Sequence, residues 1–360
     1  MLRIGIIGLP ASGKTTLFNA LTGGAARTGG YGGAEAHVGV AKVDDPRVDA
    51  LAEIFRPKKT IHATVEFADV PGLGESAEGR ADRDGETNIP PPLLMADALL
   101  LVLRAFEAPG IPHPRQSVDP ARDLEDARLD LVLRDLAVAE RRVERLERLV
   151  ALKKNPEEVA EFKLLKVVQG ALEEGRPVRG LDLSPEENGR LRGFGFLTAK
   201  PLLVVVNAGE ERIGEACTAF GLPPAENGTS VVLCAKLEEE IAGLPVVDRV
   251  DYLTGYGLEH PATDRVAKAS FALLELRCFF TVGEDEVRAW PVRAGTAALK
   301  AAGTIHSDIE RGFIRAEVIS YEEFRAAGSM AEARKRGTLR LEGKSYEVQD
   351  GDIFHVRFNV

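Results

Sequence analysis

The sequence is poor in cysteine and in aromatic residues, and it contains no long hydrophobic run. Three cysteines among 360 residues are too few for a disulfide framework, and their spacing matches no zinc site. The first apolar run is short and a glycine-rich loop follows it, so we expect neither a signal peptide nor a membrane-spanning helix. These absences favour a globular cytoplasmic protein with no membrane partner.

The chain also lacks an excess of positive charge. Its net charge is -10 at pH 7 and its isoelectric point is about 5.3, which argues against binding to DNA or another polyanion unless a local basic patch exists. The one patch of note, Arg334, Lys335 and Arg336, is interpreted first as the exposed end of a helix. The length and the 44% hydrophobic content allow two or three hydrophobic cores.

Short apolar runs alternate with helical patterns over much of the chain. Strands are expected at 2–7, 64–70, 98–103, 202–206 and 231–234, and helices at 14–21, 46–54 and 213–220. Nearly continuous apolar runs are typical of strands buried on both faces of a parallel sheet. The pattern therefore predicts a doubly wound, mostly parallel α/β domain, whose ligand lies at the carboxyl ends of the strands.

Two other patterns divide the chain further. From Leu129 apolar residues recur at alternating steps of three and four, as in a coiled coil, and a second helix is predicted from Pro156 to about Gly175. After residue 275 short strands and a short helix predict a small α+β module. We therefore expect a first domain over 1–118 and 200–275, an inserted helical hairpin over 119–199, and a third domain over 276–360.

A phosphate-binding loop is predicted between the first strand and the first helix. The candidate nucleotide-binding residues are Gly8, Pro10, Ala11, Ser12, Gly13, Lys14, Thr15 and Thr16. Gly8, Gly13, Lys14 and Thr15 fit G-x-x-x-x-G-K-[ST], in which backbone N–H groups and the helix start bind phosphate. Lys14 would assist catalysis at the β and γ phosphates, and the Thr15 hydroxyl would hold Mg²⁺.

A second motif, D-x-x-G, follows the predicted strand at 64–70. Asp69 is a candidate ligand of Mg²⁺, and the Gly72 N–H is a candidate sensor of the γ-phosphate. Where Ras-like enzymes have a glutamine that orients water, this chain has Leu73. An aliphatic side chain cannot position water, so hydrolysis must use another group or be slow.

Candidate base-binding residues follow the last two strands of the sheet. Asn207 and Glu210 lie in N-A-G-E, which lacks the lysine of the guanine-reading N-K-x-D motif. An asparagine amide can pair with adenine N6 and N7, so ATP is plausible, although GTP and a simple turn stay open as alternatives. Cys234, Ala235 and Lys236 resemble the S-A-K segment that closes a base pocket.

In this order the motifs resemble the YchF family of Obg-related P-loop ATPases. The resemblance includes "GLPASGKTTLFNALT", "DVPGL", "SVVLCAKLEEEIAGL" and the segment "VRAWPVRAGTAALKAAGTIHSDIERGFIRAEV". It implies a Ras-like P-loop domain, a C-terminal ubiquitin-like (β-grasp) TGS domain, slow hydrolysis of ATP in preference to GTP, and association with the large ribosomal subunit or the whole ribosome, with ribosomal RNA as a further contact. It also implies that His113 supplies the missing catalytic group.

Three departures from the family pattern concern catalysis. Gly33 replaces a switch threonine, "GRADRDGETNIPPP" replaces a G-L-G-N stretch, and the base motif keeps only its outer residues. Three hypotheses result: a slow ATPase that acts as a switch, a nucleotide-regulated binding module with negligible turnover, and a GTPase.

Overall fold

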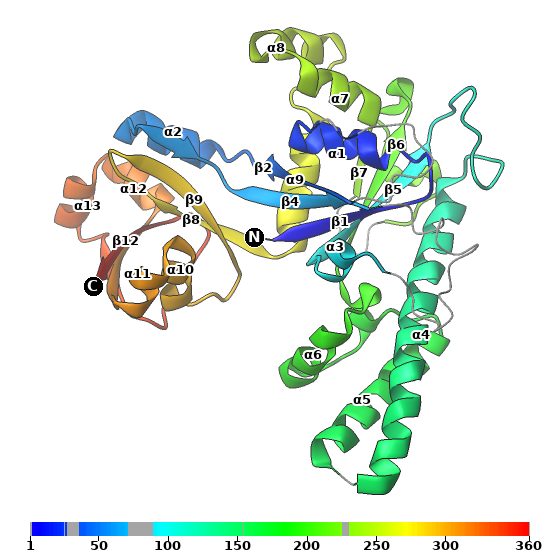
Figure 1. Ribbon diagram of the computed structural model, residues 1–360. Coiled ribbons are helices and arrows are strands. Elements are labelled where there is room, and N and C mark those ends of the chain that lie inside the picture. Colours follow the sequence, from blue (N-terminus) through cyan, green and yellow to red (C-terminus); the bar gives the residue numbers. More distant parts are fainter. Residues whose placement is uncertain are drawn as a thin grey trace. The chain divides into compact units, whose positions relative to one another are not determined.

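The computed structural model describes residues 2–24, 26, 36–70, 89–153, 155–224 and 230–359. Contacts divide the chain into two compact units (Figure 1). The first consists of residues 1–40 and 66–269, and the second of residues 41–65 and 270–360.

The first unit is built on a sheet with the strand order β2-β4-β1-β5-β6-β7. Its strands are β1 (Arg3–Ile7), β2 (His37–Lys42), β4 (Thr64–Asp69), β5 (Ala98–Ala105), β6 (Leu202–Ala208) and β7 (Ser230–Leu233). Strand β1 pairs in parallel with β4 and β5, and β6 pairs in parallel with β5 and β7. The carboxyl ends of these strands therefore meet at one edge, and the predicted doubly wound sheet is confirmed.

Helices surround this sheet. They are α1 (Lys14–Thr22), α3 (Pro91–Leu94), α7 (Ala235–Gly243), α8 (Val246–Gly255) and α9 (Ala262–Leu273). Helix α1 packs against α7, and Asn19 of α1 donates to Glu239 of α7 over 2.8 Å. None of the helices in the part of the chain that the structure describes has the length and apolar character needed to cross a bilayer.

The prediction of a helix at 213–220 is wrong. The structure has two short 3-10 turns there, η4 (Glu210–Arg212) and η5 (Cys217–Phe220). Gly214 lies between the two turns and lowers the helical propensity of the segment. Phe220 is instead buried with the Arg212 guanidinium 3.9 Å from its ring centroid, a contact that holds the turns together.

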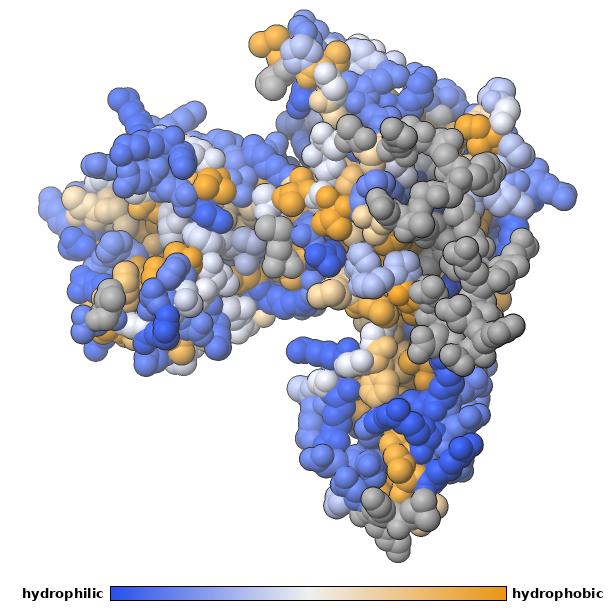
Figure 2. Space-filling view, in the orientation of Figure 1, coloured by the Kyte–Doolittle hydropathy of each residue, from blue (hydrophilic) through white to orange (hydrophobic). Residues whose placement is uncertain are grey.

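The inserted hairpin is formed by α4 (Pro120–Lys153) and α5 (Pro156–Glu173), which run side by side in Figure 1. The buried seam includes Val132, Ala139, Val143, Leu146, Leu165 and Leu172. Leu129, predicted as its first member, is 55% exposed, so the seam begins one step later. Figure 2 shows a mainly hydrophilic surface over these helices. After α5 come η1 (Val178–Gly180), α6 (Pro185–Leu191), η2 (Arg192–Phe194) and η3 (Leu197–Ala199).

The second unit is a mixed sheet with the strand order β11-β10-β12-β8-β9-β3. Its strands are β3 (Lys59–Ile61), β8 (Leu276–Thr281), β9 (Glu286–Arg293), β10 (Phe313–Ser320), β11 (Arg340–Glu342) and β12 (Asp352–Phe358). Its helices are α2 (Pro46–Phe55), α10 (Ala298–Ile305), α11 (Ser307–Arg311), α12 (Tyr321–Ala327) and α13 (Met330–Arg336). Alanines of α10 pack on Phe279, Phe313 and Phe354 of the sheet, an arrangement consistent with a β-grasp module.

The predicted three-domain division stays a prediction, but one segment of it groups differently in the structure. Residues 41–65, which sequence analysis placed in the first domain, belong to the compact unit that contains the C-terminal strands. The reason is β3, which pairs in parallel with β9 from Lys59 opposite Glu286 to Ile61 opposite Arg288. A pairing between segments more than 200 residues apart leaves no local signal in the sequence.

Candidate functional site

The loop between β1 and α1 has a backbone that requires glycine at two positions. Gly8 has a φ of 148°, Gly13 a φ of 91° and Ala11 a φ of 59°. A Cβ on Gly8 would lie 2.5 Å from the Val102 carbonyl oxygen, and one on Gly13 would lie 2.2 Å from Asn207 Nδ2. Glycine is therefore needed at both for conformational and for steric reasons. The loop leads into α1, whose first N–H groups have no intrahelical partner and favour an anion.

Lys14 lies inside this loop. Its side chain is 9% exposed, and Nζ donates to the carbonyl oxygens of Gly8, over 3.1 Å, and Leu9, over 2.9 Å. The ammonium group is thus positioned at the loop by the backbone. A buried cation at a helix start is suited to a phosphate, whose charged oxygens accept stronger hydrogen bonds than carbonyls do.

Thr15 and Asp69 meet at the carboxyl edge of the sheet. The Thr15 hydroxyl donates to Asp69 Oδ2 over 2.7 Å. Burial raises the pKa of the Asp69 carboxyl, while the Thr15 hydroxyl and the charges of Lys14 and His37 act in the opposite direction. Among the described residues Asp69 Oδ1 is buried with no hydrogen-bond partner. A hydroxyl beside an unsatisfied carboxylate oxygen fits Mg²⁺, which prefers oxygen ligands.

Asn207, at the end of β6, joins two parts of the site. Its side chain is 4% exposed. Nδ2 donates to the Ser12 carbonyl oxygen over 2.9 Å, and Oδ1 accepts from the Ala235 N–H over 2.9 Å. The amide therefore connects the loop with the start of α7. One N–H and one lone pair of the amide are left for a base.

The other predicted base-binding residues have diverse environments. Glu210 is exposed and accepts from the Tyr256 hydroxyl over 3.3 Å. Cys234 is buried, and burial raises the pKa of its thiol. Lys236 is exposed, with Nζ 3.8 Å from Glu240 Oε1. Asn207 and Ala235 are joined by a hydrogen bond, and the Cys234 thiol bonds to the Lys236 backbone N–H.

The remaining predicted loop residues differ in their exposure. Pro10 and Thr16 are half-buried, and Ala11 is exposed. Ser12 is buried, and its Oγ has no hydrogen-bond partner among the described residues, which makes it a further candidate phosphate ligand. The predictions for Gly72, Leu73 and Gly33 fall outside the residues that the structure describes.

His113 is buried beside the start of α4. Nδ1 accepts from the Arg115 N–H over 3.1 Å, so Nε2 carries the proton of the neutral ring. Nε2 lies 2.9 Å from Asp123 Oδ2, and both side chains are nearly inaccessible to solvent. Both ring nitrogens thus face protein groups in this arrangement. The catalytic role of His113 stays a prediction.

Sequence reasoning missed Asp123 and Asp135, two buried carboxylates of α4. Asp135 accepts from the N–H groups of Leu197 and Thr198, over 2.8 and 2.7 Å, and from the Thr198 hydroxyl over 2.6 Å. Burial raises the pKa of its carboxyl. In the sequence both resemble the surface acids of a charged helix, so no local signal distinguishes them.

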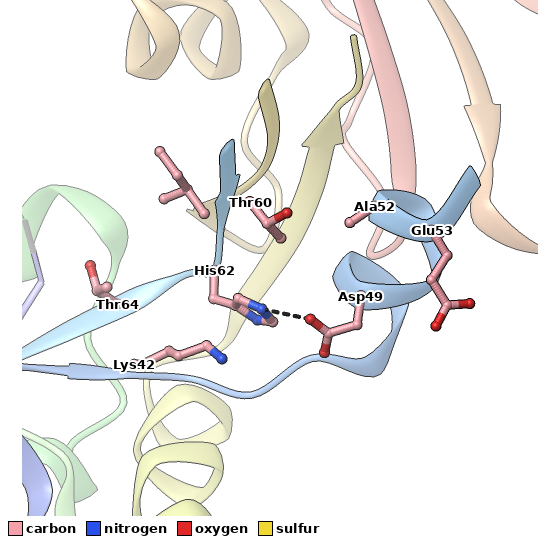
Figure 3. A pocket seen from close by; sticks show the side chains of 8 residues that line it. Lys42, Asp49, Ala52, Glu53, Thr60, His62 and Thr64 are labelled. Carbon is pink, nitrogen blue, oxygen red and sulfur yellow. Dashed lines mark hydrogen bonds and ion pairs between the residues drawn. The ribbon is translucent and has the colours of Figure 1, made fainter. Parts of the chain in front are cut away.

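The second unit contains a separate pocket of about 670 Å³. Figure 3 shows that the His62 and Asp49 side chains, which line it, point toward one another, with His62 Nε2 3.0 Å from Asp49 Oδ1. The other labelled residues lining it are Lys42, Ala52, Glu53, Thr60 and Thr64. None of the predicted nucleotide-binding residues lines this pocket.

These features define a P-loop nucleotide-binding protein. They are the glycine-rich loop, the buried lysine, the threonine–aspartate pair and the asparagine at a strand end. Residues 3–154 match the family model described as 50S ribosome-binding GTPase, and residues 276–359 match the model YchF-GTPase_C, described as a protein of unknown function (DUF933).

Full-length relatives identify the family. The chain is 39% identical to the ribosome-binding ATPase YchF of Bacillus subtilis, with 100% of both chains covered. It is 35% identical to the Obg-like ATPase 1 of Oryza sativa subsp. japonica, covering 100% of this chain and 92% of the relative. The chain belongs to the YchF family, as its sequence predicted.

Solved structures with the same fold are consistent with this family membership. The Schizosaccharomyces pombe YchF GTPase matches with a TM-score of 0.82 and 26% identity, covering 99% of this chain and 97% of that one. A GTP-binding protein of Pyrococcus horikoshii OT3 matches with a TM-score of 0.60 at 18% identity, covering 99% of this chain and 100% of the other, which shows a shared fold.

Proposed function

We propose that this protein binds MgATP at the loop from Gly8 to Thr16, hydrolyses it slowly, and associates with the ribosome in a nucleotide-dependent manner. The observation that carries the proposal is the buried Lys14 at the end of a P-loop, together with the hydrogen bond between Thr15 and the buried Asp69. The curated relatives are named ribosome-binding ATPases. Ribosome association would place the protein in the cytoplasm.

Thr15 and Asp69 would hold Mg²⁺. The free Oδ1 of Asp69 supports this assignment, and the ion would neutralise charge on the β and γ phosphates. Lys14 would move its hydrogen bonds from the loop carbonyls to phosphate oxygens. The N–H groups of the loop and of α1 would stabilise the charge that develops on the transferred phosphoryl group. Gly72 is proposed as the γ-phosphate sensor on sequence grounds.

Adenine is favoured over guanine by the environment of Ala235. Guanine O6 is an acceptor and needs an N–H donor, whereas adenine presents an amino group at N6. The Ala235 N–H is already donated to Asn207 Oδ1, and Glu210 is exposed and bonded to Tyr256. The free lone pair and N–H of Asn207 match adenine N6 and N7. Cys234 and Lys236 would border the base.

The proposed ribosomal partner is the large subunit or the whole ribosome. The description of the model that matches residues 3–154 names the 50S ribosome, which supports the large subunit. Contact with ribosomal RNA would need basic side chains, because the chain as a whole has a net charge of -10.

A binding module with negligible turnover is the second candidate. It is favoured by His113, whose two ring nitrogens contact Arg115 and Asp123 and so do not orient water in this arrangement. In both candidates the nucleotide site is the same. They differ in single-turnover phosphate release.

Calorimetry with MgATP and MgGTP, followed by single-turnover phosphate release, tests the proposal. We expect tighter binding of ATP than of GTP, slow release, and a loss of roughly 100-fold in affinity for Lys14→Ala. Lys166→Ala, in which an exposed lysine of α5 is removed, serves as the matched control. Unchanged affinity in Lys14→Ala would show that the phosphate site is assigned wrongly. Binding without release would select the second candidate.

A further inference from the structure

Arg104 is a charged residue within an otherwise apolar strand, and the nucleotide contacts proposed above do not use it. Strand β5 has the sequence ALLLVLRA, and every one of its residues is buried. Arg104 is 2% exposed and lies at the carboxyl end of the strand. Because an arginine is seldom buried to this extent unless it is paired, its guanidinium needs either partners or a role.

The guanidinium of Arg104 joins two points of the segment that leads to His113. Arg104 Nε donates to the Phe106 carbonyl oxygen over 3.1 Å, and Nη2 donates to the Ile111 carbonyl oxygen over 3.0 Å. The guanidinium carbon also lies 4.8 Å from the centroid of the Phe106 ring, a cation–π contact. We define residues 106–113 as the histidine segment. Most of it is exposed, and Arg104 connects it to the buried sheet.

The stability of the sheet alone does not account for a guanidinium at this position. Nη1 of Arg104 is buried with no hydrogen-bond partner, and no ion pair involves this residue in the described part of the chain. A buried charge without a carboxylate partner is costly, and an apolar side chain of similar volume is often neutral or stabilising where a buried charge stood. We therefore look for the role of Arg104 in the nucleotide site.

Arg104 lies at the same strand ends as the candidate base-binding residue Asn207. The two residues are directly opposite one another in the parallel ladder of β5 and β6. Residues opposite one another on neighbouring strands direct their side chains to the same face of the sheet. Adjacent strand ends thus carry the amide that donates to the phosphate loop and the guanidinium that holds the histidine segment. Sites supported from strands are positioned more precisely than sites on loops alone.

We propose that Arg104 is a positioning residue, which fixes the histidine segment to the sheet and thereby places His113 for hydrolysis. Ile111 precedes His113 by two residues, so a fixed Ile111 restricts His113 to positions within about 7 Å of it. The contact of 2.9 Å between His113 Nε2 and Asp123 Oδ2 can then be exchanged for another partner without displacement of the whole segment. This inference rests on the proposed function, in which His113 is the catalytic candidate.

The first test measures single-turnover phosphate release and MgATP affinity in Arg104→Met, His113→Ala and the double variant. We expect Arg104→Met to lower release about tenfold, as His113→Ala does, with MgATP affinity within about twofold of the unchanged chain. Both changes would remove the same contribution, so the double variant should release phosphate within about twofold of His113→Ala. A double variant about 100-fold slower than the unchanged chain would show that Arg104 acts independently of His113. That result, or an unchanged rate in Arg104→Met, overturns the inference.

Arg249→Met is the matched control. Arg249 of α8 also donates to two backbone carbonyl oxygens through the same two nitrogens, from Nε to Leu244 over 3.0 Å and from Nη2 to Ala242 over 2.8 Å. It connects α7 with α8 and touches no residue of the histidine segment through these bonds. Release should stay within about twofold of the unchanged chain. A loss equal to that of Arg104→Met would show a general effect of removing a guanidinium and would contradict the assignment.

Backbone hydrogen exchange separates this inference from the proposed function. Followed by mass spectrometry on the full chain, peptides covering 106–116 should exchange at least about tenfold faster in Arg104→Met than in the unchanged chain or in Arg249→Met. Equal exchange overturns the inference. If the unchanged chain releases no phosphate, the proposed hydrolysis fails, while exchange still decides whether Arg104 fixes the segment. Arg104→Gln, which retains an N–H donor, replaces Arg104→Met in both measurements if methionine prevents folding.

Discussion

The phosphate side and the base side of the nucleotide site are built differently. On the phosphate side the loop from Gly8 to Thr16 is continuous in sequence, and its conformation is set by glycines and the start of α1. On the base side Asn207 and Ala235 come from different strand ends. The Asn207 amide accepts from the Ala235 N–H and donates to the Ser12 carbonyl oxygen. Local sequence therefore determines the proposed phosphate-binding loop, whereas the proposed base site depends on contacts that form only when the sheet is assembled.

The largest expected effect is that of Gly13→Ala, which should disturb both the phosphate loop and the Asn207 amide. The added Cβ would lie 2.2 Å from Asn207 Nδ2 at a φ of 91°, so the loop or Asn207 must move. We expect MgATP affinity to fall by about 100-fold or more. Calorimetry measures it.

Gly170→Ala is the control for Gly13→Ala. Gly170 lies within α5 with nothing within 4 Å of a built Cβ, so the substitution should stabilise the helix by up to about 1 kcal/mol. Equal affinity for MgATP in the two variants would contradict the steric account of the loop.

Asn207→Ala should distinguish the contribution of the base side from that of the phosphate side. It leaves the Ser12 carbonyl and the buried Ala235 N–H without their partner, which lowers the free energy of unfolding by about 2–4 kcal/mol. The preference for ATP over GTP should shrink more than the affinity of the loop for inorganic triphosphate. Denaturant unfolding and competition calorimetry measure these effects.

Asn188→Ala is the matched control, because the Asn188 amide also donates to two carbonyl oxygens but is exposed. Its free energy of unfolding should change by less than about 0.5 kcal/mol. Loss of stability without any change in nucleotide preference would place Asn207 outside base recognition.

His113→Ala sharpens the comparison on the catalytic side. If His113 leaves Asp123 to position water, its removal lowers single-turnover phosphate release about tenfold without changing MgATP affinity. His62→Ala is the control, since His62 is also buried with a carboxylate 3.0 Å from Nε2 but lines the separate pocket. Equal rates in both variants would remove His113 from the mechanism.

The smallest expected effect is a pH dependence from Asp69. Because burial raises the pKa of this carboxyl, it takes up a proton at a higher pH than an exposed aspartate does, and the protonated form is a poor ligand for Mg²⁺. MgATP affinity should therefore fall on acidification before exposed carboxyls titrate. ATP measured with a chelator instead of Mg²⁺ should not show this fall.

The raised pKa of Asp69 also changes the free energy of unfolding in a defined direction. The folded protein holds the Asp69 proton more tightly than the unfolded chain, so the contribution of Asp69 to the free energy of unfolding falls as pH rises through the interval between the two pKa values. Thermal unfolding of the Asp69→Asn variant across that interval would lack this contribution. A parallel pH profile in both proteins would contradict the shift.

Sequence analysis succeeded where a local signal existed. Sequence analysis predicted the capped start of α5 at Asn155, the apolar runs of β1, β5 and β6, and the glycine-rich loop before α1, with only small errors at their ends. It failed at 213–220, where a buried Phe220 outweighed helical periodicity. It also missed the burial of Asp123 and Asp135, because the partners of these carboxylates lie in other segments of the chain.

The contact between positions 13 and 207 has a consequence for the evolution of the family. A side chain at residue 13 would occupy the space of the Asn207 amide, so replacement of the glycine is tolerated only if residue 207 becomes smaller. In alignments of homologous chains the two positions should therefore covary, although 194 residues separate them in the numbering.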